Sequence, residues 1–297
     1  MINPTRDPGP GGLAASMAAG AFALALITTP MPAQIGAIGV VPGGTASGAD
    51  ALAGTPVFTN SALTLPRGRW GFSGLVGLTR QSTDLFDPQL GDEFTRTFTN
   101  TSFFAMGAYA VHDRALVGVM VPPVTRRELK DEYQGDTFTE SETGAGDPIL
   151  FGKYQLARSG DGRTALAGVA SVSLPLGKSG FGSEGARVGL GAVASRQVNK
   201  ITLHAEAGVG IPTHDADGET AVGLNAAGVF AVSPRIWVNG ELLTTISAGE
   251  YTTLAAPSVR FALGRMAFLD VGFAFKALSS IEGYQPITAL AGLVLVP

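Results

Sequence analysis

The most suggestive chemical pair in this sequence is a histidine and a glutamate two residues apart. His204 and Glu206 would point to the same side of an extended strand, and such a pair can transfer protons or bind a metal. An enzyme would also need a nucleophile with a base in reach, and the context of no serine marks one. The alternative is a polar pair on the wall of a barrel, and we favour it. We therefore expect no catalytic residue, no metal site, no cofactor and no enzymatic activity.

Two further patterns resemble ligand-binding motifs, but we expect neither to be a binding site. Residues 189–194 match the loose dinucleotide pattern G-x-G-x-x-A, but these glycines alternate within an extended stretch and no helix follows. The acidic residues Asp215, Asp217 and Glu219 lack the spacing of a calcium loop, so we expect a solvated loop, with weak divalent binding as the alternative. The sequence has no cysteine, and its net charge of −4 gives no footprint for nucleic acid.

The composition is unusually apolar, yet its apolar residues are dispersed. Hydrophobic residues make up 45% of the 297 residues, charged residues make up 15%, and the mean hydropathy is +0.26. Beyond the N-terminal region no apolar run is long enough for a membrane-spanning helix. Apolarity without a long run indicates alternation at a period of two residues, which is typical of β-strands.

The spacing of these strands is regular along the chain. From Arg69 to Val296 the sequence reads as twelve short alternating segments, and the gaps between them are alternately long and short. Lipid requires that every backbone polar group be paired, and a closed barrel achieves this without an edge. We predict an all-β fold, a twelve-stranded antiparallel transmembrane β-barrel with both ends on the short-turn side. The long gaps, which we expect to be loops, are 81–96, 125–146, 177–186, 213–219, 248–252 and 278–284.

Each strand can be divided into two faces. Along 201–212, for example, Ile201 and Leu203 belong to an apolar face and His204 and Glu206 to a polar one. A soluble sandwich would alternate as well. An export signal, small glycine-rich polar faces and apolar faces of about 9–11 residues favour the barrel. The predicted lumen-lining residues are Lys153, Arg187, His204, Glu206, Asn239, Glu241, Arg260, Asp270 and Lys276.

Aromatic residues gather near the short turns. Tyrosine and tryptophan favour the membrane–water interface, and ordinary strand aromatics are the alternative. Trp237 and Phe268 have the parity of the lumenal face, so either the strands bulge there or both rings point inward. The predicted interface residues are Trp70, Tyr109, Tyr154 and Phe230.

The sequence divides into three parts. Residues 1–33 contain the apolar run 13–29 followed by Pro30 and Pro32, which indicates a cleaved signal peptide rather than a membrane anchor. Residues 34–66 are a low-complexity extension that could enter the barrel from the turn side as a plug. Residues 67–297 form the barrel.

One stretch resembles a known family. The residues GAGDPILFGKYQL at 144–156 are similar to the G-x-G-D-x-x-L-x-x-K-Y-x-L strand of the outer-membrane "phenol meta-pathway degradation" family. Residues 102–122, 171–177 and 203–208 resemble its neighbouring strands. The resemblance implies a transporter-like barrel. Such barrels usually end in an aromatic residue that the assembly machinery reads, whereas this sequence ends in Leu-Val-Pro at 295–297.

These observations favour a passive channel or transporter in the bacterial outer membrane. Its solutes would be small and, as the family name implies, include hydrophobic or aromatic ones. The alternatives are a non-transporting barrel whose extracellular loops bind a partner and an outer-membrane enzyme. The expected partners are outer-membrane lipid, lipopolysaccharide, the barrel assembly machinery and a small-molecule solute, with no nucleic acid.

Overall fold

The computed structural model describes residue 57 and residues 59–87, 92–133, 136–183, 185–213, 219–264, 266–280 and 286–296. The expected signal peptide, most of the expected extension, His214, Asp215 and Asp217 lie outside these ranges. No helix among the described residues is long and apolar enough to cross a membrane. The strands are β1 (Trp70–Asp87), β2 (Asp92–His112), β3 (Ala115–Tyr133), β4 (Asp136–Gly144), β5 (Ile149–Arg158), β6 (Thr164–Ser173), β7 (Arg187–Val198), β8 (Ile201–Pro212), β9 (Ala221–Ser233), β10 (Ile236–Ser247), β11 (Glu250–Ala262), β12 (Ala267–Ser279) and β13 (Ile287–Leu295).

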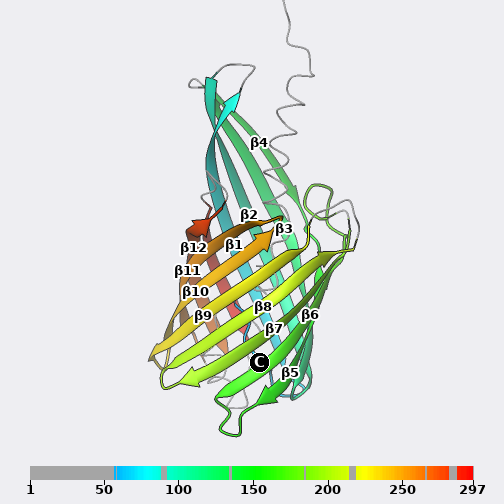
Figure 1. Ribbon diagram of the computed structural model, residues 1–297, viewed down its shortest axis with the longest axis vertical. Helices are drawn as coiled ribbons and strands as arrows, with labels where there is room; N and C mark the ends of the chain where they lie inside the picture. Colours follow the sequence, from blue (N-terminus) through cyan, green and yellow to red (C-terminus); the bar gives the residue numbers. More distant parts are fainter. Residues whose placement is uncertain are drawn as a thin grey trace, which may run out of the picture.

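Twelve of these strands form a closed antiparallel ring (Figure 1). Each strand pairs with its neighbours in sequence, except that β4 pairs only with β3, and β3 continues the ring by pairing with β5. The ring closes where β1 pairs with β13, from Phe72↔Leu295 to Arg80↔Ile287. The predicted twelve-stranded barrel is therefore confirmed. The first residue of β1 and the last of β13 both lie at the short-turn end.

The change of partner along β3 occurs at two prolines. β3 pairs with β5 as far as Met120↔Ile149 and with β4 from Thr125↔Gly144 onward, and Pro122 and Pro123 lie between. The ladder with β2 also shifts register here. Proline has no backbone N–H to donate to a ladder, so this is where a strand can most easily exchange one neighbour for another.

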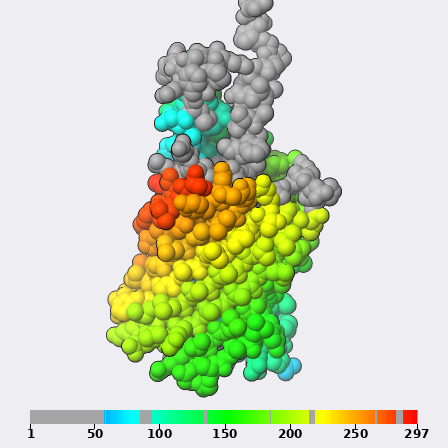
Figure 2. Space-filling model, in the orientation of Figure 1, coloured from blue at the N-terminus to red at the C-terminus, as the bar shows by residue number. Residues whose placement is uncertain are grey.

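On the long-loop side of these prolines the sheet continues beyond the barrel. We call this extension the arm and define it as residues 81–87, 92–99, 125–133 and 136–144. Figures 1 and 2 show it projecting past the rim of the barrel. The prediction of loops at 81–96 and 125–146 is therefore wrong for most of these residues. Charged and hydroxyl side chains lie on both faces of the arm, with scattered apolar residues such as Phe98 and Leu129 between them, so apolar–polar alternation is lost although backbone pairing persists.

The distribution of apolar and polar side chains across the barrel wall is the reverse of that in a soluble protein. Large apolar side chains such as Leu190, Leu242 and Phe273 are about half exposed on its outer face. Charged and polar side chains are buried on the inner face. An exterior of this kind suits hydrocarbon, because lipid solvates apolar side chains and the strand ladder pairs the backbone.

Candidate functional site: the occupied lumen

The interior of the barrel holds a piece of the chain itself. We call residues 57 and 59–66 the lumenal segment. Thr59, Asn60, Ser61 and Ala62 are fully buried, although they belong to no strand. At the short-turn end Gly68 adopts a left-handed conformation (φ 79°) and donates its N–H to the Ala110 carbonyl at 2.8 Å. This turn reverses the chain from the lumen into β1, and glycine adopts such a φ without steric cost.

Two glutamates bind the N-terminal part of the segment. The N–H groups of Val57 and Thr59 donate to the two oxygens of Glu241, at 2.8 and 2.6 Å. Asn60 donates to Glu206 twice, from its backbone N–H at 3.1 Å and from its Nδ2 at 2.6 Å. Both carboxylates are buried, at 3% and 5% exposure. Hydrogen bonds to a charged acceptor are stronger than neutral ones.

Neutral and cationic side chains bind the next two residues of the segment. The N–H of Ala62 donates to Ser195 Oγ at 2.8 Å, and Ser195 shares a 2.8 Å hydrogen bond with His204 Nδ1. Lys153 Nζ donates to the Ser61 carbonyl at 2.8 Å, and Gln155 Nε2 donates to the Ala62 carbonyl at 3.2 Å. The wall thus supplies acceptors for the N–H groups and donors for the carbonyls of one backbone stretch. His204 and Glu206 both take part in this network, so in the structure they lie as polar residues on the wall of the barrel.

Small and apolar residues complete the fit. Ala62 is buried in one cluster with Ala165, Ala167 and Val193 of β6 and β7, so short side chains allow the segment to lie against that wall. Leu65 belongs to a larger cluster at the short-turn end that includes Trp237 and Phe268, whose ring centroids are 6.1 Å apart. Both rings are buried and point inward, which is the second of the two expected alternatives.

Asp113 holds the end of the segment. Thr64 Oγ1 donates to the Asp113 carbonyl at 2.8 Å, and the Arg67 N–H donates to Asp113 Oδ1 at 3.1 Å. Sequence reasoning missed Asp113, which reads as an ordinary turn residue. It also missed Gln155, although that residue has the same strand parity as Lys153 and could have been found from it.

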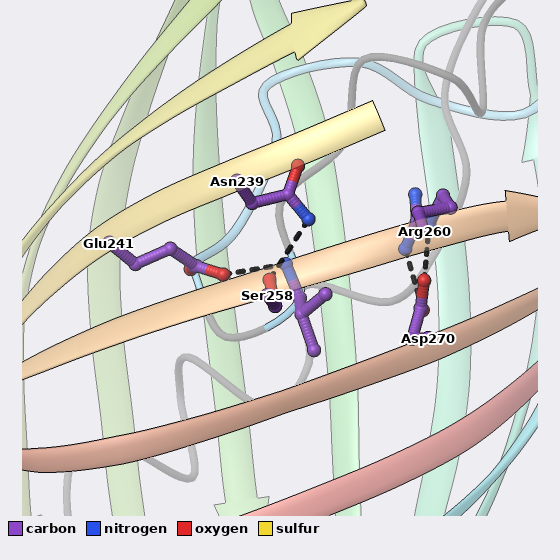
Figure 3. A network of polar contacts seen from close by, with 6 residues as sticks. Asn239, Glu241, Ser258, Arg260 and Asp270 are labelled. Carbon is purple, nitrogen blue, oxygen red and sulfur yellow. Dashed lines mark hydrogen bonds and ion pairs between the residues drawn. The ribbon is translucent and has the colours of Figure 1, made fainter. Parts of the chain in front are cut away.

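Figure 3 shows four further polar residues of the wall together with Glu241. Arg260 and Asp270 face each other across β11 and β12 and form a bidentate pair of 2.6 and 2.8 Å at 1% exposure. Asn239 Nδ2 donates to Ser258 Oγ at 3.0 Å. Of the expected lumenal residues, Arg187 and Lys276 lie apart from the segment's hydrogen bonds, near the long-loop ends of β7 and β12.

The four expected interface aromatics are all at the short-turn end. Trp70, Tyr154 and Phe230 are about half exposed on the outer face. Tyr109 is opposite Trp70 in the β1–β2 ladder, and their ring centroids are 4.6 Å apart. Their side chains form part of the outer surface close to the turns.

The motif that resembles the phenol meta-pathway family has a structural explanation. Asp147 accepts hydrogen bonds from Gly177 N at 2.8 Å and from both the N–H and the hydroxyl of Ser183 at 2.6 Å. A Cβ at Gly144 would lie 2.4 Å from the Phe181 ring, over which Arg127 is stacked at 4.7 Å. The motif therefore anchors the β6–β7 connection against β3 and β4.

Comparisons with known proteins support the fold. No protein-family model and no curated protein matches this sequence. The COG4313 outer-membrane channel from Pseudomonas putida F1 is similar in structure, with a TM-score of 0.58, 13% identity, and coverage of 79% of this chain and 97% of that chain. The KdgM porin (TM-score 0.46, 6% identity, coverage 75% and 98%) and the Ralstonia pickettii toluene transporter TbuX (TM-score 0.44, 9% identity, coverage 78% and 90%) are more distant. At these identities the likeness concerns the barrel fold alone.

Proposed function

We propose that this protein is a passive channel or transporter for small solutes in the bacterial outer membrane. The observation that carries this proposal is that the interior contains a strip of chain instead of being filled by wall side chains. Eight-stranded barrels fill with side chains and sixteen-stranded ones leave an aqueous channel, so twelve strands leave room for a narrow conduit. An enzyme is not needed to account for His204 and Glu206, because both belong to the hydrogen-bond network that holds the segment.

The proposed solutes include hydrophobic or aromatic molecules. The family resemblance suggests this class, and the inward face of β2, β3 and β5 supports it. Met106, Met120, Ile149 and Phe151 are buried there in one apolar cluster. Methionine and phenylalanine provide an adaptable, polarisable lining for apolar solutes.

The setting of the channel is part of the proposal. Residues 1–33 would direct export, the barrel assembly machinery would insert residues 67–297, and lipid and lipopolysaccharide would surround the outer face. The ring of Trp70, Tyr109, Tyr154 and Phe230 supports this orientation, since such side chains favour the membrane interface.

A second candidate is a barrel that does not transport and binds a partner through its arm. The observation in its favour is that the lumen is occupied while four strands project beyond the rim. Conductance separates the two candidates.

The test is single-channel recording in planar bilayers, comparing the mature protein with a variant that lacks residues 34–66. Removing the lumenal segment should raise the conductance, because it is the chain that fills the conduit. Equal conductance would reject the segment as a plug, and the absence of any channel in both proteins would favour the non-transporting barrel. Glu206→Gln should lower the cation-to-anion permeability ratio, since it removes one lumenal negative charge.

A further inference from the structure

We propose that Glu206 and Glu241 together act as a carboxylate latch, whose release frees residue 57 and residues 59–62 from the lumen while residues 64–66 stay anchored. This inference deepens the proposed channel function, because it assigns the opening step to two named side chains.

The first argument is the use of acceptors. Each of the two carboxylates uses both oxygens on the segment, and together they accept four hydrogen bonds from Val57, Thr59 and Asn60. Three of these donors are backbone N–H groups. The latch therefore binds mainly the backbone of the segment and depends little on the identity of its side chains. Three of the four bonds are 2.6–2.8 Å long, and all four are charge-assisted in a low-dielectric site, where such bonds are strongest.

The second argument is that the other contacts are single hydrogen bonds and bind residues 61 and 62 instead. Ser195, Gln155 and Lys153 each contribute a single hydrogen bond to the segment. The lysine bond goes to a neutral carbonyl. The two glutamates are the anions that hold Val57, Thr59 and Asn60, so neutralising them removes the charged acceptors of these four bonds.

The third argument is that the base of the segment is held by different forces. Leu65 packs among apolar residues, and Thr64 and Arg67 bind Asp113 in the first short turn. None of these contacts involves a latch carboxylate. Breaking the latch should therefore release the N-terminal part of the segment and leave a tether at the short-turn end.

Glutamine tests the latch without changing shape. An amide offers one acceptor oxygen where the carboxylate offers two, and its NH₂ group would face an N–H donor of the segment. The protein has no cysteine, so Ser61→Cys provides a single thiol at a fully buried position. Its reaction rate with a charged methanethiosulfonate reagent, measured on the full mature protein in liposomes, reports exposure of the segment.

We expect the rate to rise about tenfold or more in the Glu206→Gln, Glu241→Gln double variant, and by less in each single variant, because a hydrogen bond to a charged group is worth roughly an order of magnitude or more. Ser258→Ala is the matched control. It removes a buried hydrogen bond to Asn239 on the neighbouring strand and leaves the four latch bonds in place, so its rate should equal that of the parent. Heat-dependent gel migration verifies that each barrel is folded, and Glu241→Gln alone decides the question if the double variant does not fold.

An unchanged rate in the folded latch variants would overturn the proposal, as would an equal rise in Ser258→Ala. A disulfide between Ala62→Cys and Ala167→Cys, two positions in one buried cluster, supplies a second measurement. Oxidation should abolish, and reduction restore, any conductance gained on Glu241→Gln. Labelling that rises without conductance would support the latch and reject the channel. Conductance with unchanged labelling would support the channel and reject the latch.

Discussion

Two arginine–aspartate pairs with the same geometry lie in different regions of the molecule. Arg260 and Asp270 pair across β11 and β12 in the lumen, and Arg96 and Asp131 pair across β2 and β3 in the arm. Both are direct cross-strand neighbours joined by two hydrogen bonds of 2.6–2.8 Å. The lumenal pair is 1% exposed, whereas the side chains of the arm pair are 17% and 27% exposed.

The difference teaches that environment, not geometry, sets what an ion pair does. In the arm, Asp131 raises the pKa of Arg96 above its ordinary value, mainly through their side-chain hydrogen bond, but water and salt screen the pair. In the lumen each charge depends on its partner, because a lone buried charge is costly. In the lumenal pair each buried charge is therefore compensated by the other, whereas the arm pair adds little to the stability of the fold.

The largest expected effect is at Asp270. Asp270→Asn removes the carboxylate that pairs with the buried Arg260 and should lower the free energy of unfolding by about 3–5 kcal/mol. Urea unfolding in detergent, followed by gel migration, measures this. The matched control is Arg260→Met combined with Asp270→Leu, which removes both charges and should cost much less. A double variant as unstable as Asp270→Asn would contradict the argument.

A slightly smaller effect is expected one residue further along β12, on the opposite face. Val271 points outward, so Val271→Arg near the midplane should cost about 2–4 kcal/mol in lipid. Ala274→Arg points inward and avoids the lipid penalty, although crowding adds a separate cost. Ser141→Arg on exposed β4 serves as a water-facing control. Equal tolerance at positions 271 and 141 would count against a lipid-facing wall.

The smallest effect is expected in the arm. Asp131→Asn should change stability by only about 0.2–1 kcal/mol, because partly exposed ion pairs are screened. That change should shrink as the salt concentration rises, and channel conductance should stay the same. The measurement is unfolding at low and high ionic strength. A loss as large as that of Asp270→Asn would show that the arm is coupled to the barrel and would remove the contrast between the two pairs.

The sequence by itself predicted the barrel, the number of its strands and the outer face. Ile201 and Leu203 were expected on the apolar face and His204 and Glu206 on the polar one. The first two are exposed and the last two buried, because strand parity fixes each side chain to one face. The same parity led to His204, Glu206 and Glu241. The sequence failed in the arm, where charged and hydroxyl residues occur on both faces and alternation carries no signal.

Only the tertiary structure decided what the inward residues bind. No local pattern relates Val57 to Glu241, which are 184 positions apart, or Asn60 to Glu206. Closing the ring brings β5, β7, β8 and β10 around one axis, and the turn at Gly68 directs the preceding residues along it. Strand periodicity is a local property and can be read from the sequence. Which strip of chain fills the lumen depends on closure, and closure exists only in three dimensions.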